Sequence, residues 1–339
     1  MMRMKFLRIS LLVVLCLAWA GVCGWGRQQP VPGLQADLEE AARLVRLEPQ
    51  AGIEYDYVVT AAIRFLLFWI SRDDVGQGYI RMGAIPGDPE TEIVHLVMGS
   101  DPAKAPLSVN RWGAATEVWR RRDSSGAFFG FMKASKGDSV AAARDELSRE
   151  QQVQRYPFEG IIIRTAGGRA VSTSVPINSA TDFSLNQLPQ ARNMVIDGLR
   201  TAARPPRVTD GRALGECASG IGFLFLLRSM IEELINSAKA PITRCYIYAA
   251  RRYTMSARTS EPVGELKVAL KLRGKQGRIE KSYRNLRRAD FRVVNTLTGN
   301  PTDFQIVFGT EGALRGVPVQ FEHQPNWWFK VTINLHPGK

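Results

Sequence analysis

The sequence predicts an α+β protein built mainly from long antiparallel β-strands in one or two curved sheets, covered by a few helices. Runs rich in β-branched and aromatic residues recur along the chain, and Gly, Pro or Asp interrupt them. Only a few segments show the 3.6-residue spacing of an amphipathic helix. With 45% hydrophobic and 23% charged residues among 339, the composition is that of a folded globular protein and excludes disorder or a coiled coil as the main architecture.

The first residues predict export. Arg3, Lys5 and Arg8 precede an apolar stretch over residues 9–22, the order of a secretory signal. Small residues favour cleavage after Ala20, with Gly24 as the second choice. We therefore expect a signal peptide at 1–24 and a periplasmic or extracellular protein.

Two other readings of this segment are less favoured. An uncleaved anchor is one alternative. A lipoprotein is another, but Val22 stands before Cys23 where the lipid-attachment motif requires Gly or Ala. The stretch is short for a bilayer span, and no transmembrane span is expected in the mature chain.

Export gives the cysteines a structural meaning. Cys16 leaves with the signal and Cys23 lies in the cleavage region, so the folded body keeps Cys217 and Cys245. In an oxidising compartment such a pair predicts a disulfide rather than a metal site or a nucleophile. Two buried free thiols are the alternative.

The N-terminal region divides into a leader and a β-rich part. Residues 25–52 indicate a tether followed by a short helix over 34–47. The β-rich part spans 53–202, beginning with one long strand over 53–70. A turn is expected at 71–78 and a returning strand at 79–82. Further predicted strands lie at 92–98, 112–121, 127–134, 158–165 and 169–175, the last two joined by the Gly167-Gly168 turn.

Helices are predicted at 138–152, 187–201 and 219–239. The third is the most hydrophobic internal segment, but Arg228 and two glutamates interrupt it, which favours a helix lying on a sheet. A boundary is expected near 203–211, so that a second, basic β-sheet region spans 212–339. Its predicted strands lie at 243–257, 264–273, 278–294, 303–308, 317–323 and 327–335.

A search for catalytic groups finds few candidates. His95 lies in an apolar strand, and Ser100 follows it in a Gly-Ser-Asp turn. Asp73 and Asp74 are adjacent in the predicted turn, where neighbouring side chains point apart. No motif for a metal, a phosphate-binding loop or a cofactor is found, so none of these is expected.

The strongest signal is electrostatic. The whole chain has a formal charge of +13, and residues 251–292 contain 13 Lys or Arg against four acids, a net of +9. Here Leu266, Val268 and Leu270 alternate with cationic or small residues, so one strand face is core and the other cationic. This assigns Lys267, Lys271 and Arg273 to a face for an anionic envelope polymer or membrane surface. The alternative is a solvated face whose Lys and Arg residues protect a sheet edge against aggregation. Export makes nucleic acid an unlikely partner.

An aromatic cluster lies near the C-terminus. Trp327 and Trp328 are adjacent in a predicted strand, so one of them is expected to point outward. Trp328 is taken as the candidate ligand-binding residue, against a role in the core.

Three short segments resemble uncharacterised exported bacterial proteins: Arg72–Gly76, Gly99–Pro102 and Asn110–Gly113. The resemblance covers residues 60–115 and implies no activity, so no catalytic residue follows from it.

Two functions are therefore compared. The first is an exported, non-enzymatic binding or envelope-associated protein whose cationic sheet face binds an anionic glycan, lipid or protein. The second is a secreted hydrolase with a site assembled from residues distant in sequence. An open cationic face indicates the first, and a pocket with converging titratable groups indicates the second.

Overall fold

The structure of the chain is a computed structural model. It describes residues 33–50, 52–65, 68–105, 110–133, 156–180, 182–201, 204–209, 217, 222–237, 240–248, 251–272, 274–327 and 329–338. The predicted signal peptide, the predicted helix at 138–152, Arg273 and Trp328 lie outside these residues.

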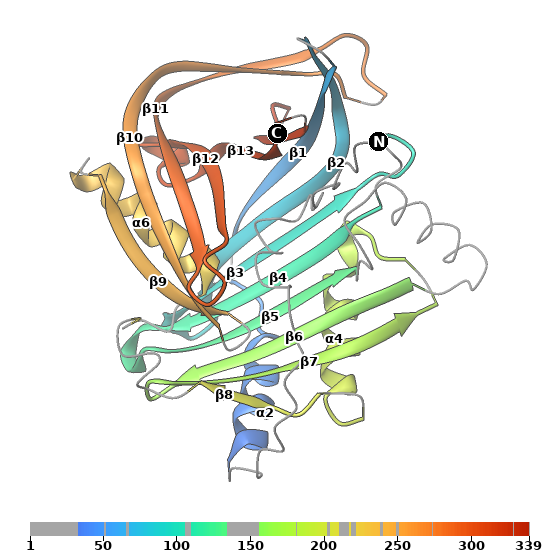
Figure 1. The fold of residues 1–339 in the computed structure, drawn as a ribbon, viewed down its shortest axis with the longest axis vertical. Helices are drawn as coiled ribbons and strands as arrows, with labels where there is room; N and C mark the ends of the chain where they lie inside the picture. The colour runs from blue at the N-terminus through green and yellow to red at the C-terminus, as the bar shows by residue number, and fades with distance from the viewer. Residues whose placement is uncertain are drawn as a thin grey trace, which may run out of the picture.

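The described residues form one 14-stranded sheet that curves strongly (Figure 1). All its pairings are antiparallel, which confirms the predicted fold class with a single sheet. The N-terminal strands are β1 (Ile53–Phe65), β2 (Phe68–Ile85), β3 (Asp88–Ser100), β4 (Trp112–Arg120), β5 (Ser125–Lys133), β6 (Tyr156–Ala166), β7 (Arg169–Ser179) and β8 (Arg207–Thr209). The C-terminal strands are β9 (Ile242–Tyr248), β10 (Arg251–Leu270), β11 (Ile279–Asn295), β12 (Pro301–Gly309), β13 (Pro318–Asn326) and β14 (Phe329–Leu335).

The first and last strands of the chain are neighbours in the sheet. β1 pairs with β14 in a register that places Ile63 opposite Phe329 and Tyr57 opposite Leu335. This pairing joins the N-terminal strands to the C-terminal strands. The two outer strands, β8 and β9, therefore come from the middle of the sequence.

Curvature brings these outer strands close together. Ala170 of β7 and Ile247 of β9 belong to one buried cluster with Cys217 and Cys245. The two sulfurs are 2.06 Å apart, in disulfide geometry. The cysteine pair expected from the sequence thus connects the segment between β8 and the next helix to β9.

Helices cover both faces of the N-terminal strands. Helix α2 (Leu34–Leu44) and helix α4 (Leu188–Gly198) pack on one face, in a cluster with Ile93, Phe129 and Ile162. Helix α6 (Phe223–Ser237) packs on the opposite, concave face with Ile161, Phe291 and other C-terminal residues. Strands β3 to β6 are consequently buried on both sides. The helices predicted at 34–47, 187–201 and 219–239 are confirmed within these bounds.

The first hairpin differs from the sequence prediction. The strand expected over 53–70 is in fact two strands, with the chain reversing between Phe65 and Phe68. The predicted turn at 71–78 lies inside β2. Its glycines serve close packing, since a Cβ on Gly76 would lie 2.5 Å from the Gly99 carbonyl oxygen of β3.

The Gly167-Gly168 turn is as predicted, with positive φ angles of 55° and 72° that favour glycine. Short 3-10 helices in the described residues are η2 (Arg121–Asp123), η3 (Leu185–Gln187) and η4 (Gly312–Leu314). None of the described helices has the length and apolar character needed to cross a membrane.

Candidate functional site

The β10–β11 hairpin, residues 251–295, extends beyond its neighbours β9 and β12 and curves over toward the end of β1 and β2, and we call it the arm (Figure 1). β9 pairs with β10 only up to Ala257, and β12 pairs with β11 only from Leu286 onward. Between these points the two strands pair with each other alone. The arm has one apolar face there, because Val268 and Leu270 are 3% and 4% exposed.

The other face of the arm carries exposed lysines. Lys267 and Lys271 alternate with Val268 and Leu270, and both are exposed. Neither ammonium forms an ion pair with an acid among the described residues. The strand register therefore follows the alternation read from the sequence.

Three arginines nearer the base of the arm lie beside acids. Arg292 forms a two-pronged bond with Asp303 at 2.7 and 2.8 Å, and Arg258 lies 3.9 Å from the same carboxylate. Arg288 lies 3.5 Å from Glu261. Lys281 lies on the apolar face, 5.6 Å from the ring centre of Tyr283. The cations thus divide between two faces. Among the described residues at the outer end of the arm, Arg278 lies beside Asp73, whereas Lys267 and Lys271 form no ion pair.

Asp73 anchors the outer end of the arm to the sheet. Its Oδ2 accepts the backbone N–H of Lys271 at 3.1 Å and lies 3.7 Å from the Arg278 guanidinium. Its Oδ1 accepts the Thr60 hydroxyl at 3.2 Å. This catalytic candidate therefore has a structural role, holding the arm across β2.

Asp74 and Ser100 also have structural partners. Asp74 is 3% exposed and bonds the Lys104 ammonium at 2.8 Å. Ser100 accepts the Arg111 N–H at 2.7 Å and donates to the Arg111 carbonyl at 3.2 Å, bridging β3 to the start of β4. The catalytic candidates are not brought together.

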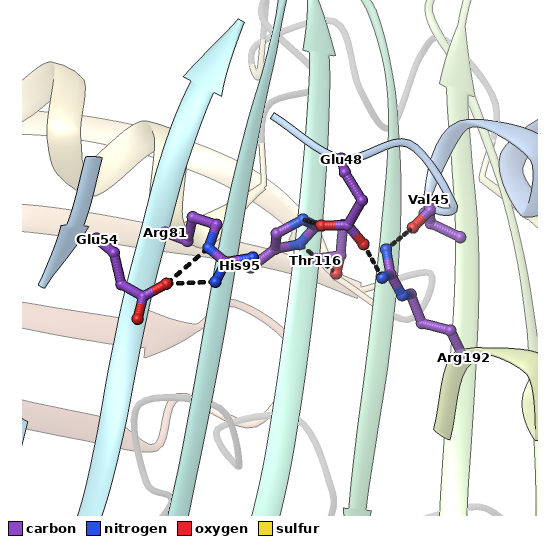
Figure 2. A network of polar contacts seen from close by, with 7 residues as sticks. All are labelled: Val45, Glu48, Glu54, Arg81, His95, Thr116 and Arg192. Atoms are coloured by element: carbon purple, nitrogen blue, oxygen red, sulfur yellow. Dashed lines mark hydrogen bonds and ion pairs between the residues drawn. The ribbon is translucent and has the colours of Figure 1, made fainter. Parts of the chain in front are cut away.

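His95 lies in a polar network beneath the segment that follows α2 (Figure 2). Its Nε2 is 3.1 Å from Glu48 and its Nδ1 is 2.9 Å from the Thr116 hydroxyl. Arg192 of α4 bonds Glu48 and donates to the Val45 carbonyl at 2.7 Å. Nearby, Arg81 bonds Glu54 on the neighbouring strand.

Burial lowers the pKa of His95, so the imidazole is neutral at neutral pH. Burial opposes ionisation of Glu48, but hydrogen bonds from His95 and Arg192 outweigh it and hold its pKa at about 2. An ionised carboxylate can only accept a hydrogen bond, so the Nε2 of His95 carries the proton and donates it to Glu48. The Nδ1 of His95 then accepts a hydrogen bond from the Thr116 hydroxyl.

Carboxylate, imidazole and hydroxyl here stand in the order of a catalytic triad, yet the hydroxyl cannot meet a substrate. Thr116 is 0% exposed and His95 is 1% exposed. A nucleophile needs access to the bond it attacks. The network therefore fastens α2 and α4 to β3 and β4. Of these residues only His95 is a candidate from the sequence, because Glu48 and Arg192 are distant from it in the chain.

A fully buried carboxylate, Glu117 of β4, was not identified from the sequence. It accepts the backbone N–H groups of Leu224 and Phe225 at 2.8 and 3.0 Å, at the start of α6. Burial raises its pKa to about 7, although both hydrogen bonds act against this. A lone glutamate within the apolar Ala114–Val118 strand is the only local sequence signal.

A small pocket on the concave side contains one further acid. Glu159 lines it with Gly130, Met132 and Tyr248, among others. Burial raises the pKa of Glu159, while Arg204 at 3.3 Å opposes that shift. None of the catalytic candidates lines this pocket. Among the described residues, no three His, Cys, Asp or Glu side chains are grouped as metal ligands.

The aromatic residues near the C-terminus are partly accessible. Trp327 is 68% exposed at the turn between β13 and β14, while Phe329 is 4% exposed. Phe68 and Ile70 of β2 are also exposed, at 73% and 63%. Both residues fall inside the single long strand expected over 53–70. Their signal is an unbroken apolar run, which fits a buried strand equally well.

No family model and no curated protein matches this chain. Among solved structures, it is similar to a β-barrel-like protein of a domain of unknown function, DUF1849, from Brucella abortus. The similarity has a TM-score of 0.42 and 7% sequence identity, and it covers 86% of this chain and 99% of that one.

Proposed function

We propose that this chain is an exported, non-enzymatic protein that binds an anionic polymer or surface of the cell envelope through the arm. One observation carries the proposal. Lys267 and Lys271 stand exposed, without described acidic partners, on a hairpin that pairs with no other strand at that level. Arg273, next in the alternation, belongs to the proposed face by its sequence position.

The geometry favours binding over hydrolysis. Asp73, Asp74, His95 and Ser100 each bond a structural partner, and no described hydrogen bond or ion pair joins any two of them. Exposed lysines on an open strand face, by contrast, attract phosphate or sulfate groups without a shaped pocket. Such binding weakens with salt, because exposed charges are screened over about 8 Å at physiological ionic strength.

The test measures binding to dextran sulfate at several salt concentrations. The variant Lys267→Glu, Lys271→Glu, Arg273→Glu is expected to bind about tenfold or more weakly at low salt, an order-of-magnitude expectation for a charge-driven site. The matched control Arg46→Glu, Arg122→Glu, Arg200→Glu makes the same charge change at exposed positions outside the arm. Equal loss in both variants would show a non-specific effect of net charge, and no loss in the first would reject the arm as the binding face.

A further inference from the structure

The end of the β1–β2 hairpin has exposed apolar side chains on both of its faces. Phe68, Trp69 and Ile70 are consecutive residues of β2, and they are 73%, 40% and 63% exposed. Successive strand residues point to opposite faces, so the described residues leave both faces of this end at least partly open to water. Leu66 and Leu67 stand in the sequence between the two strands.

A second hairpin adds a tryptophan to this end. Because Ile63 pairs with Phe329, the turn between β13 and β14 lies beside the end of β1. This turn carries Trp327, which is 68% exposed. We call the described apolar residues Phe68, Trp69, Ile70 and Trp327 the tip.

Cations, not acids, border the tip. Arg64 lies opposite Trp69 in the hairpin, and the Lys330 ammonium is 5.9 Å from the Trp69 ring centre. Arg72 is exposed three residues from Trp69 along β2. Residues 62–72 and 323–331 contain no Asp or Glu. The nearest acid on β13, Glu322, lies 3.1 Å from Lys330 and is partly neutralised by it.

The arm brings further cations to the same end of the molecule. Lys271 and Arg278 meet β2 at Asp73, and the outer end of the arm lies beside the end of the first hairpin (Figure 1). Phe68 is five residues beyond Asp73, or roughly 16 Å at about 3.3 Å per strand residue. The apolar tip therefore extends beyond a level of positive charge.

We propose that the tip inserts into the surface of a bilayer that contains anionic lipids, with the neighbouring cations at the level of the phosphates. Tryptophan prefers the membrane–water interface, and Phe, Ile and Leu gain by leaving water for the acyl boundary. Basic residues next to an apolar insert add attraction to anionic headgroups. A soluble polyanion would bind the lysines but would leave the apolar side chains of the tip exposed to water. The tip therefore favours a lipid surface as the partner.

This inference rests on the proposed function for the electrostatic part of membrane binding, and it adds the insertion of apolar side chains. The experiment is flotation with vesicles of phosphatidylethanolamine and phosphatidylglycerol, and with vesicles of phosphatidylcholine. Phe68→Ser, Ile70→Ser, Trp327→Ser removes three exposed apolar side chains, so the fold should be unaffected. Leu297→Ser is the control, because Leu297 is 78% exposed in the β11–β12 turn, at the other end of β11.

The expected result is binding to anionic vesicles that falls about tenfold or more in the tip variant and stays within about twofold in Leu297→Ser. Lipids brominated on the acyl chains should quench tryptophan fluorescence of the unmodified protein. In Trp69→Phe, Trp327→Phe, Trp328→Phe this quenching should be lost while vesicle binding persists.

The possible failures are distinguishable. If the tip variant floats like the unmodified protein and no quenching occurs, insertion is rejected. The arm proposal still stands in that case if dextran sulfate binding depends on Lys267 and Lys271.

If dextran sulfate binding is independent of these lysines but the tip variant loses vesicle binding, insertion stands and the arm proposal fails. Dimerisation that the tip variant abolishes, without vesicle binding, would assign the tip to a second copy of the chain and reject the membrane.

Discussion

Strands β3 to β6 and the arm are both antiparallel ribbons, but they differ in what covers them. Helices α2 and α4 pack on one face of β3 to β6, and α6 packs on the other, so polar groups there need protein partners. His95 and Glu117 each find them. The outer arm has one covered face and one open to water, where Lys267 and Lys271 need none. Titratable groups in the covered region thus serve structure, and the open region is available for binding.

The disulfide connects the segment after β8 to β9, the strand that pairs with the base of the arm, and its removal is expected to have the largest effect. Cys217 and Cys245 are 28 residues apart. On the chain-entropy estimate, Cys217→Ser, Cys245→Ser lowers the free energy of unfolding by roughly 3 to 4 kcal/mol. Chemical denaturation of the oxidised protein and the double variant measures this. A loss below about 1 kcal/mol would mean that the edges of the sheet hold together without the bond.

The second prediction concerns the covered region and its pH dependence. Glu117 has a native pKa of about 7 against a usual value of 4.5, so the native state keeps its proton where the unfolded state has lost it. Protonation of Glu117 therefore contributes to the free energy of unfolding below pH 4.5. This contribution is lost as pH rises through 7, a change of roughly 3 kcal/mol.

Glu117→Gln should remove this pH dependence. His95 acts in the opposite sense, because burial lowers its pKa and stability then rises with pH up to the usual His value. The quantity to compare is therefore the difference in unfolding free energy between Glu117→Gln and the unmodified protein from pH 4.5 to 7.5. A constant difference across that interval would contradict a buried, protonated Glu117.

A matched pair of glycines tests packing in the two regions directly. A Cβ on Gly160 of β6 would lie 2.3 Å from Cγ2 of Val195 in α4, a fully buried residue. A Cβ on Gly264 of the arm meets nothing within 4 Å. Gly160→Ala is expected to cost about 1 to 3 kcal/mol through overpacking, whereas Gly264→Ala should be close to neutral. Thermal unfolding of both variants checks this, and equal losses would show that the arm is packed like the covered strands.

The smallest expected effect is on the stability of the charge-reversed arm. Lys267→Glu and Lys271→Glu change exposed side chains only, so each should alter the free energy of unfolding by about 0.5 kcal/mol or less. Urea titration measures it. A loss of several kcal/mol would mean that these lysines contribute to folding, and it would remove the contrast with the covered strands.

Much of the strand pattern follows from the sequence alone, because alternation records which face of a strand meets water. Leu266, Val268 and Leu270 alternate with Lys267 and Lys271, and the structure places them on opposite faces. The amphipathic spacing of α4 and α6 and the Gly167-Gly168 turn are equally local signals. Local geometry decides these features, so nearby residues are sufficient to predict them.

The first hairpin shows where local patterns fail. An apolar run over residues 53–70 favours a strand, but nothing local shows where it reverses or whether its end is buried. Pairing of β1 with β14 and of β2 with β3 determines that Phe68 and Ile70 lie beyond the covered sheet. Their exposure thus depends in part on β14, which lies hundreds of residues from β1 in the sequence.

The sequence by itself determined the fold class, the alternation of the arm and the cysteines available for pairing, since composition and short-range periodicity carry that information. Only the tertiary structure decided that β1 pairs with β14, that Asp73 anchors the arm, and that Glu48, His95 and Arg192 meet beneath α2. These contacts join residues far apart in the chain. Burial then sets their chemistry, because a carboxylate or imidazole takes its pKa and its access to solvent from neighbours that the local sequence does not specify.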